Sequence, residues 1–236
     1  QIFQNLNTSK TQVINYQSKM KIACDLRSSL KFYDLPFNII NEIREDFSDV
    51  EIYMIKGNGQ EPLTKDTEVY WGNRIVPNIV EDHENLKWVH FGSTGTDRLH
   101  ECEKAKNLIV TNSRGLVTPE MTTSVIGFMT LCARRYDYLI NSYQKFVISR
   151  EDYNNVYEEV HSLEGKNCYI FGYGDMGRSI AKALNGLGMK VIGFKRSLSK
   201  AYNDSFANIE HINNLHRFIE KADYIVNCLP LNLSTK

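Results

Sequence analysis

The sequence of 236 residues can form one large domain or two modest ones, and its 28 basic residues balance its 28 acidic residues. A net charge near zero gives no electrostatic footprint for nucleic acid or for an anionic membrane surface, so neither partner is expected. The five scattered cysteines contain no Cys-x-x-Cys pair, which argues against a disulfide framework or a zinc site and favours free thiols in a reducing cytoplasm.

The amino-terminal residues 1–19 are polar and lack the apolar core of a signal peptide, so we expect them to form an extension. No apolar run in the sequence reaches the length of a membrane span. Regular structure is therefore expected to begin at Met20.

Strand-like and helix-like patterns alternate over residues 20–112. Apolar runs predict strands at 20–25, 50–55, 67–71, 86–91 and 108–111, and helical spacing predicts helices at 37–47, 75–85 and 97–105. Such alternation is typical of a parallel sheet with helices on both faces. We expect an α/β domain of the flavodoxin-like type.

One loop of this region follows the fourth expected strand and leads into a helix. Open parallel sheets bind ligands at the carboxyl ends of their strands, so the backbone N–H groups of Ser93, Thr94 and Gly95 could hold a small anion such as a carboxylate. An ordinary turn capped by Thr96 or Asp97 explains the same residues equally well.

A long helix is predicted over residues 118–147. Thr118 is a suitable N-cap, Pro119 suits the first helical position and Glu120 places an acid in the first turn. A helix of this length could cross between two domains, pair with a second subunit or serve simple core packing.

The most informative stretch is a strand, a glycine loop and a helix. The apolar run Cys168 to Phe171 leads into glycines at 172, 174 and 177, after which a helical pattern follows. This context is the dinucleotide-binding fingerprint. The first glycine permits a tight turn, the second lets the backbone approach a pyrophosphate, and the third allows close packing of helix on strand. The predicted cofactor site consists of Gly172, Tyr173, Gly174, Asp175, Met176 and Gly177.

The next strand, expected at 189–194, decides between the two nicotinamide cofactors. An NAD site commonly places an acid at the end of this strand to bind the ribose hydroxyl. Lys195, Arg196 and Ser197 stand there instead, and could bind the extra phosphate of NADP. We therefore favour NADP(H), while NAD(H) stays possible and a solvated basic turn is the alternative.

The remaining pattern predicts a helix at 213–221 and a buried strand at 223–230. The carboxyl end of that strand should lie beside the cofactor, which adds Cys228, Leu229 and Pro230 to the predicted site. Residues 113–236 are accordingly expected to form a Rossmann dinucleotide-binding domain.

These segments together resemble the D-isomer-specific 2-hydroxyacid dehydrogenase family, in the family's order and at about its spacing. The matching stretches are 86–99, 110–115, 118–135, 172–181 and 222–231, and the basic run 194–197 is similar to NADP-preferring glyoxylate/hydroxypyruvate reductases. The resemblance implies a substrate-binding domain at 20–112, with Ser93, Thr94 and Gly95 on the substrate carboxylate, and an active site between the two domains. It also implies a homodimer that interconverts a small 2-oxoacid and a D-2-hydroxyacid by hydride transfer.

The family's catalytic Arg, acid and His come after the segment that corresponds to Leu229 and Pro230, and the given sequence stops at Lys236. No residue here is therefore assigned a catalytic role. A six-stranded dinucleotide-binding sheet also requires further strands after residue 229. Thr123 and Ser124 differ from the Glu and the His or aromatic residue that the family often carries there. We favour a piece of a longer protein, with a naturally shortened product or a partner that completes the fold as alternatives.

Two other functions remain open at this point. A non-catalytic dinucleotide-binding protein, acting as a sensor or assembly partner, would need the glycine loop but no catalytic residues. An S-adenosylmethionine-dependent enzyme also carries a glycine-rich loop, although the third glycine and the basic strand end fit a dinucleotide better.

Overall fold

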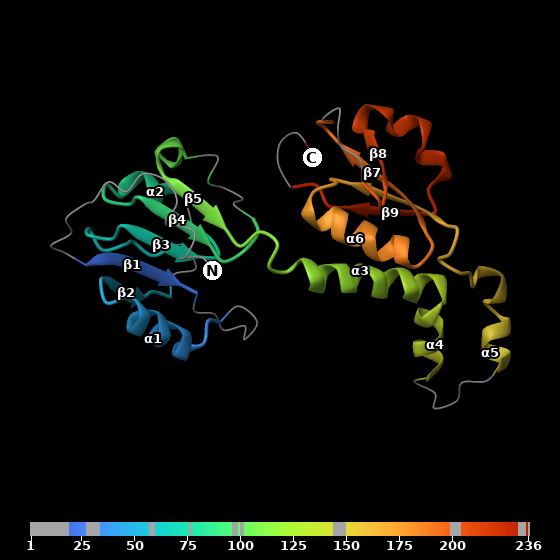
Figure 1. The fold of residues 1–236 in the computed structure, drawn as a ribbon. Coiled ribbons are helices and arrows are strands. Elements are labelled where there is room, and N and C mark those ends of the chain that lie inside the picture. The colour runs from blue at the N-terminus through green and yellow to red at the C-terminus, as the bar shows by residue number, and fades with distance from the viewer. Residues whose placement is uncertain are drawn as a thin grey trace. The chain divides into compact units, whose positions relative to one another are not determined.

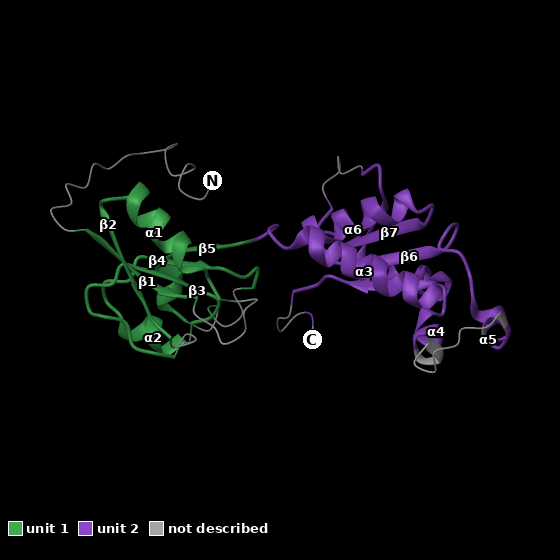
Figure 2. Ribbon diagram, turned by 90° about the horizontal axis from the view of Figure 1, so that it is seen from below, with its two compact units in different colours: residues 1–113 green, residues 114–236 purple. Residues whose placement is uncertain are grey.

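A computed structural model of the chain divides into two compact units, residues 1–113 and 114–236 (Figure 2). The structure describes residues 19–26, 34–56, 60–75, 77–95, 99, 102–143, 150–198, 204–230 and 235. The expected amino-terminal extension lies outside these residues apart from Lys19. Within this described part of the chain, no helix combines the length and the apolar character that crossing a bilayer requires.

Unit 1 is a five-stranded parallel sheet with the order β2-β1-β3-β4-β5. Its strands are β1 (Met20–Asp25), β2 (Val50–Met54), β3 (Val69–Gly72), β4 (Trp88–Phe91) and β5 (Ile109–Asn112); its helices are α1 (Phe37–Asp46), α2 (Pro77–Asp82) and the 3₁₀ turn η4 (Lys104–Asn107). This strand order is that of flavodoxin-like folds. The predicted fold class is confirmed for this unit.

The two faces of this sheet follow from alternation along its strands. In β1, Ile22 and Cys24 belong to one core cluster together with Ile40 of α1, whereas Ala23 belongs to a second cluster with Val80 of α2. Successive side chains of a strand point to opposite faces, so one strand contributes to both cores. Figure 1 shows α1 and α2 on opposite sides of the sheet.

Unit 2 carries a four-stranded parallel sheet with the order β8-β7-β6-β9. Its strands are β6 (Asn167–Phe171), β7 (Lys190–Lys195), β8 (Asn208–His211) and β9 (Tyr224–Asn227); its helices are α3 (Thr118–Ala133), α4 (Tyr136–Tyr143), α5 (Arg150–Asn154) and α6 (Asp175–Gly186), with 3₁₀ turns η5 (Tyr157–Glu159), η6 (Ile212–Arg217) and η7 (Ile219–Lys221). In sequence order the strands run 3-2-1-4, which is the start of the Rossmann arrangement. The second half of the fold-class prediction is therefore confirmed as well.

Helix α6 forms because its apolar residues share one face. Gly177, Ile180, Ala181 and Leu184 are all buried, at the i, i+3, i+4, i+7 spacing of an amphipathic helix. Its neighbour α3 packs alongside it, as Figure 1 shows, and the Thr122 hydroxyl donates a hydrogen bond to Ser179 Oγ at 3.0 Å.

The single helix predicted at 118–147 is wrong, because the chain breaks between α3 and α4. Arg135 has a φ of 53°, in the left-handed region that interrupts a right-handed helix. Its guanidinium is bonded to Asp137 at 3.1 Å and is also paired with Glu159. These ion pairs hold the turn that the apolar spacing alone did not reveal. Residues 144–147 lie outside the described part of the chain.

The observed elements differ from the predicted ones at three further places, where the local sequence pattern is weak. The helix predicted at 213–221 consists of the two 3₁₀ turns η6 and η7. In the helix predicted at 97–105, the described residues include Leu99, in 3₁₀ conformation, and the start of the 3₁₀ turn η4 at Lys104. Strand β8 was not predicted, because its sequence Asn-Ile-Glu-His has a single apolar residue. It is nevertheless held in the sheet by parallel pairing with β7.

Candidate functional site

The glycine loop turns sharply at Gly172, directly after β6. This residue has a φ of +85°, and a Cβ atom built on it would lie 2.8 Å from both the carbonyl carbon and the oxygen of Cys228. Any side chain would therefore strain the turn and collide with the backbone that follows β9. The loop and the end of β9 can meet only because a glycine stands here.

The other two glycines have different surroundings. A Cβ atom on Gly177 would lie 2.7 Å from the carbonyl oxygen of Gly172, so this glycine allows α6 to pack against the loop. Gly174 is the N-cap of α6, and the nearest atom to a Cβ built there is Arg114 Nη2 at 4.0 Å. The backbone is thus tightly packed at 172 and 177 but approachable at 174, as a pyrophosphate site requires.

The amino-terminal end of α6 offers hydrogen-bond donors at the same place. The N–H groups of its first turn, Asp175 to Gly177, have no acceptor within the helix. Together with the helix dipole, such groups bind phosphates. The residues present therefore fit the diphosphate of a dinucleotide.

The three side chains of the loop, those of Tyr173, Asp175 and Met176, differ in burial. Tyr173 is 2% exposed, and a Cβ atom on Gly193 of β7 would lie only 2.1 Å from its ring, so the missing side chain in β7 makes room for this tyrosine. Met176 packs partly against the core of the unit. Tyr173 thus anchors the loop through its side chain, whereas the Asp175 carboxylate lies at the surface.

The carboxyl end of β7 lies beside the glycine loop. The backbone N–H groups of Gly172 and Tyr173 both donate to the carbonyl oxygen of Phe194, at 3.2 and 3.1 Å. Arg196 and Ser197 follow at once, are exposed, and hydrogen-bond to no other residue that the structure describes. Their polar groups are available to a ligand at this edge of the sheet.

The end of β9 completes the same edge. The Cys228 N–H donates to the carbonyl oxygen of Phe171 at 2.7 Å, and Leu229, 39% exposed, donates to Asn227 Oδ1 at 3.0 Å. Pro230 is exposed. Burial raises the pKa of the Cys228 thiol, which keeps it protonated and disfavours a nucleophilic role. The chain crosses from one side of β6 to the other between β8 and β9, and ligands bind at such switch points.

One functional candidate escaped sequence reasoning. Arg114 reaches the start of α6, where its Nε donates to Asp175 Oδ2 at 2.7 Å. The two residues are 61 positions apart, so no local pattern signals the pair.

In unit 1, the loop after β4 has its carbonyl groups occupied. The carbonyl oxygen of Ser93 accepts from the N–H of Ser113, that of Thr94 accepts from Asn112 Nδ2, and that of Gly95 accepts from the Ser93 hydroxyl. The backbone N–H groups of these three residues donate to no residue within the described ranges. The loop thus presents donors, which suits an anion, although the switch point of this sheet lies between β1 and β3. The alternative caps, residues 96 and 97, lie outside the described part.

His90 of β4 contacts Thr111 and Ser113, which lie next to this loop. Its Nδ1 lies 2.8 Å from Thr111 Oγ1, which also accepts a hydrogen bond from Trp88 Nε1 at 2.8 Å. Its Nε2 lies 3.5 Å from Ser113 Oγ, and Ser113 holds the loop through its N–H. Burial lowers the pKa of His90, so the ring is neutral in the folded state near neutral pH.

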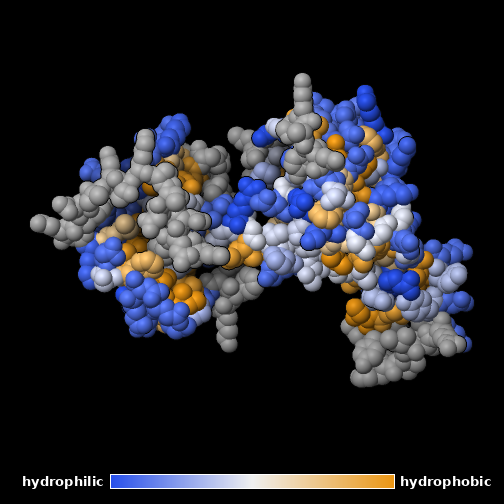
Figure 3. All heavy atoms as spheres, viewed as in Figure 1, coloured by the Kyte–Doolittle hydropathy of each residue, from blue (hydrophilic) through white to orange (hydrophobic). Residues whose placement is uncertain are grey.

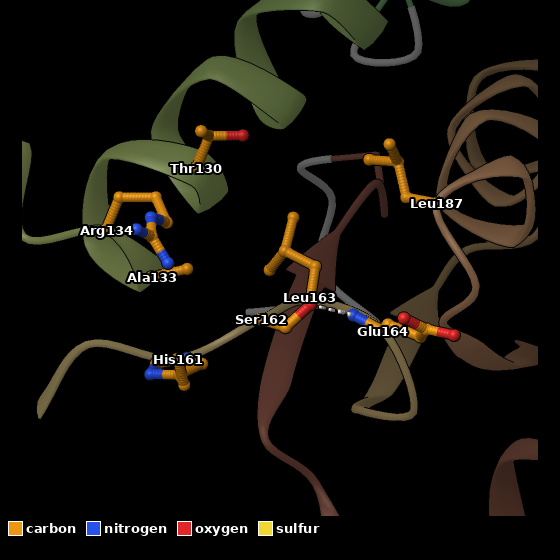
Figure 4. A pocket seen from close by; sticks show the side chains of 8 residues that line it. All are labelled: Thr130, Ala133, Arg134, His161, Ser162, Leu163, Glu164 and Leu187. Atoms are coloured by element: carbon orange, nitrogen blue, oxygen red, sulfur yellow. Dashed lines mark hydrogen bonds between the residues drawn. The ribbon is translucent and has the colours of Figure 1, made fainter.

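A separate hollow of about 240 Å³ lies elsewhere in unit 2 (Figure 4). It is lined by Thr130, Ala133, Arg134, His161, Ser162, Leu163, Glu164 and Leu187. These residues come from the end of α3, the segment before β6 and the end of α6, which places the hollow at the amino-terminal edge of the sheet. The glycine loop is at the opposite edge, so this hollow is not the predicted cofactor site.

Residues 126–236 match the family described as D-isomer specific 2-hydroxyacid dehydrogenase, NAD binding domain. A hydroxypyruvate reductase of Thermotoga maritima is 24% identical over 164 residues, covering 69% of this chain and 50% of that protein. A glycerate dehydrogenase of Methylorubrum extorquens is 28% identical over 159 residues, covering 64% of this chain and 46% of that protein. The chain thus spans about half the length of the curated relatives it matches.

Solved structures share the fold. A protein of Pyrococcus horikoshii OT3 superposes with a TM-score of 0.72 at 20% identity, covering 92% of this chain and 64% of that chain. An NAD-dependent formate dehydrogenase of Staphylococcus aureus in complex with NAD gives 0.69 at 18% identity, covering 92% and 67%. An NADPH-dependent glyoxylate/hydroxypyruvate reductase of Sinorhizobium meliloti in complex with NADP and sulfate gives 0.67 at 17% identity, covering 92% and 65%.

Replacing Gly172 by alanine should destabilise unit 2 by about 2–4 kcal/mol, because the left-handed backbone and the clash with Cys228 act together. Gly186→Ala is the matched control. A Cβ there meets nothing within 4 Å, so this change should be neutral or stabilise α6 by up to about 1 kcal/mol. Urea unfolding followed by far-ultraviolet circular dichroism measures both, and equal stabilities of the two variants would contradict the packing described here.

The stability of unit 1 should fall as the pH drops below the ordinary histidine pKa of 6.5. The folded-state pKa of His90 is lowered, so the unfolded chain binds the proton first. The contribution is fully present above pH 6.5 and is lost as the pH falls toward the folded-state pKa. Both tryptophans, Trp71 and Trp88, lie in unit 1, so their fluorescence during urea unfolding reports this unit. His90→Gln should flatten the pH dependence, and an unchanged slope would contradict this role.

Proposed function

The chain belongs to the D-isomer specific 2-hydroxyacid dehydrogenase family, and we propose that it binds a nicotinamide dinucleotide on residues 172–177 for the reduction of a small 2-oxoacid to a D-2-hydroxyacid. One observation carries this proposal. The carboxyl ends of β6, β7 and β9 meet at a single edge beside the first turn of α6, around a loop in which, of the three glycines, only Gly174 has no close neighbour at its Cβ position.

The bound dinucleotide supplies the hydride, and the residues of this chain hold it in place. The first-turn N–H groups of α6 bind the diphosphate, and the residues after β9 lie along the next part of the cofactor. Tyr173 fixes the loop by filling the space above Gly193. The catalytic Arg, acid and His of the family are assigned to no residue of this chain.

NADP(H) is the cofactor that the end of β7 favours. Arg196 and Ser197 are exposed beside the glycine loop, and Lys195 ends the strand. A guanidinium and a hydroxyl at this position suit the 2′-phosphate, and the described residues 195–198 include no carboxylate that could bind a free ribose hydroxyl. Relatives of the same fold were solved with NAD and with NADP, so the choice depends on these local residues.

The substrate carboxylate is proposed to bind at Ser93, Thr94 and Gly95. The carbonyl groups of all three are already hydrogen-bonded, which leaves N–H donors toward an anion. The two curated relatives are named for hydroxypyruvate and for glycerate. Both compounds are small molecules that carry a carboxylate. A small 2-oxoacid is accordingly the proposed substrate class.

The purified protein in its full natural length should oxidise NADPH with glyoxylate or hydroxypyruvate, and should use NADH less well. Arg196→Asp should weaken NADPH binding far more than NADH binding, because only NADPH carries the 2′-phosphate. Lys190→Asp makes the same change of charge at the other end of β7 and is the control. Binding without turnover would favour a non-catalytic dinucleotide-binding protein. If Arg196→Asp weakened the binding of NADPH and NADH equally, the preference for NADP(H) would be contradicted.

We also propose that the protein is a homodimer that buries the outer surface of α3 and α4. Met121 and Phe128 of α3 are 45% and 70% exposed, and Tyr136 and Ile140 of α4 are 42% and 56% exposed. Figure 3 shows the apolar surface over α4. Large apolar side chains grouped on neighbouring helices mark interaction surfaces.

Phe128→Glu should convert the dimer into single chains, because it places a charge in an apolar interface. Phe37→Glu alters another exposed phenylalanine, in α1 of unit 1, and should leave the dimer intact. Sedimentation equilibrium provides the measurement. A wild-type protein with the mass of one chain would contradict the proposed dimer.

A further inference from the structure

Arg114 brings a positive charge to the start of α6. Its Nε donates to Asp175 Oδ2 at 2.7 Å, and its Nη2 lies 4.0 Å from the position of a Cβ atom on Gly174. Gly174 is the one glycine of the loop at which a ligand can approach the backbone. The guanidinium therefore lies beside the approach to the proposed diphosphate position.

The carboxylate of Asp175 explains why a positive charge is needed beside the proposed diphosphate position. This carboxylate lies in the first turn of α6, where the helix dipole stabilises a negative charge. A diphosphate that binds the N–H groups of the same turn would meet this carboxylate as a like charge. A cation bound to Asp175 removes that repulsion, and Arg114 is the cation that the structure places there.

The guanidinium also has donors left for a ligand. Arginine carries five N–H groups, and within the described part of the chain only the Nε of Arg114 is engaged. The terminal Nη groups can donate two parallel hydrogen bonds to a phosphate. Both side chains are 63% exposed, so the pair contributes little to the stability of the fold.

We propose that Arg114 is a diphosphate-binding residue, which balances the Asp175 carboxylate and donates its terminal N–H groups to the dinucleotide. The inference rests on the proposed function and adds a residue to its site. The role differs from that of Arg196, because NADH and NADPH share the diphosphate. Arg114 therefore sets the affinity for both cofactors without discriminating between them.

Isothermal titration calorimetry with NADPH and NADH tests this role on the intact protein. Arg114→Ala should weaken the binding of both cofactors by about tenfold or more and by similar factors. Arg114→Lys, which keeps the charge but loses the planar fork, should fall between the wild type and Arg114→Ala. Arg217→Ala removes an exposed arginine of η6 in the same unit and should change neither affinity.

Asp175→Asn separates charge balance from a structural effect. This variant should bind both cofactors as tightly as the wild type or more tightly, because the like charge is gone. The double variant of Arg114→Ala and Asp175→Asn should recover part of the affinity that Arg114→Ala loses. Thermal unfolding of each variant, expected to match the wild type, confirms that the fold is retained.

The outcomes distinguish this inference from the proposed function. A wild-type protein that binds neither cofactor would overturn the proposed function itself. Wild-type binding that Arg114→Ala leaves unchanged, or weakens for NADPH alone, would overturn only the role of Arg114. A double variant no better than Arg114→Ala would contradict the balance between Arg114 and Asp175.

Discussion

The contact between the glycine loop and the backbone after β9 determines the arrangement of the candidate site. Because Gly172 has no side chain, the carbonyl group of Cys228 can pack against its backbone, at a place where a Cβ atom would collide with it. The N–H of Cys228 then bonds to Phe171, and the N–H groups of Gly172 and Tyr173 bond to Phe194. Three strand ends are thereby joined around one loop, which brings residues 172–177, 194–197 and 228–230 to one edge of the sheet.

The charges at this edge follow from that packing. Helix α6 starts where the loop ends, so its free N–H groups and the positive end of its dipole face the same edge. Asp175 compensates the dipole, and Arg114 in turn compensates Asp175. Arg196 lies exposed after the neighbouring strand. Packing thus fixes the backbone donors, while the two arginines beside them are the residues proposed to bind the phosphates of the cofactor.

The parts of the fold that depend on local pattern were predictable from the sequence. The strand at Asn167–Phe171, the glycine loop and the helix after it form a continuous motif, in which Gly172 and Gly177 are required by close packing and Gly174 leaves the backbone open. Alternating strands and helices likewise predicted the parallel sheet of unit 1. The residues proposed to bind substrate and cofactor stay predictions, because the structure shows their placement and not their ligands.

The parts that depend on distant contacts were not predictable. The break after α3 is held by Arg135 and by Glu159, a residue 24 positions away, so apolar spacing predicted one continuous helix. Strand β8 has a single apolar residue and is recognised only through its pairing with β7. The pair of Arg114 and Asp175 spans 61 positions. In each case tertiary contacts outweigh the local preference of the segment.

Amide hydrogen exchange of the protein with and without NADPH tests most directly whether the dinucleotide lies on the glycine loop. Protection is expected in peptides that contain Tyr173 to Arg178 and Phe194 to Ser197, because ligand contacts suppress local opening at that edge. The hollow lined by His161 and Leu163 should show no change. Protection confined to that hollow, or no protection of residues 173–178 at saturating NADPH, would contradict the placement of the cofactor.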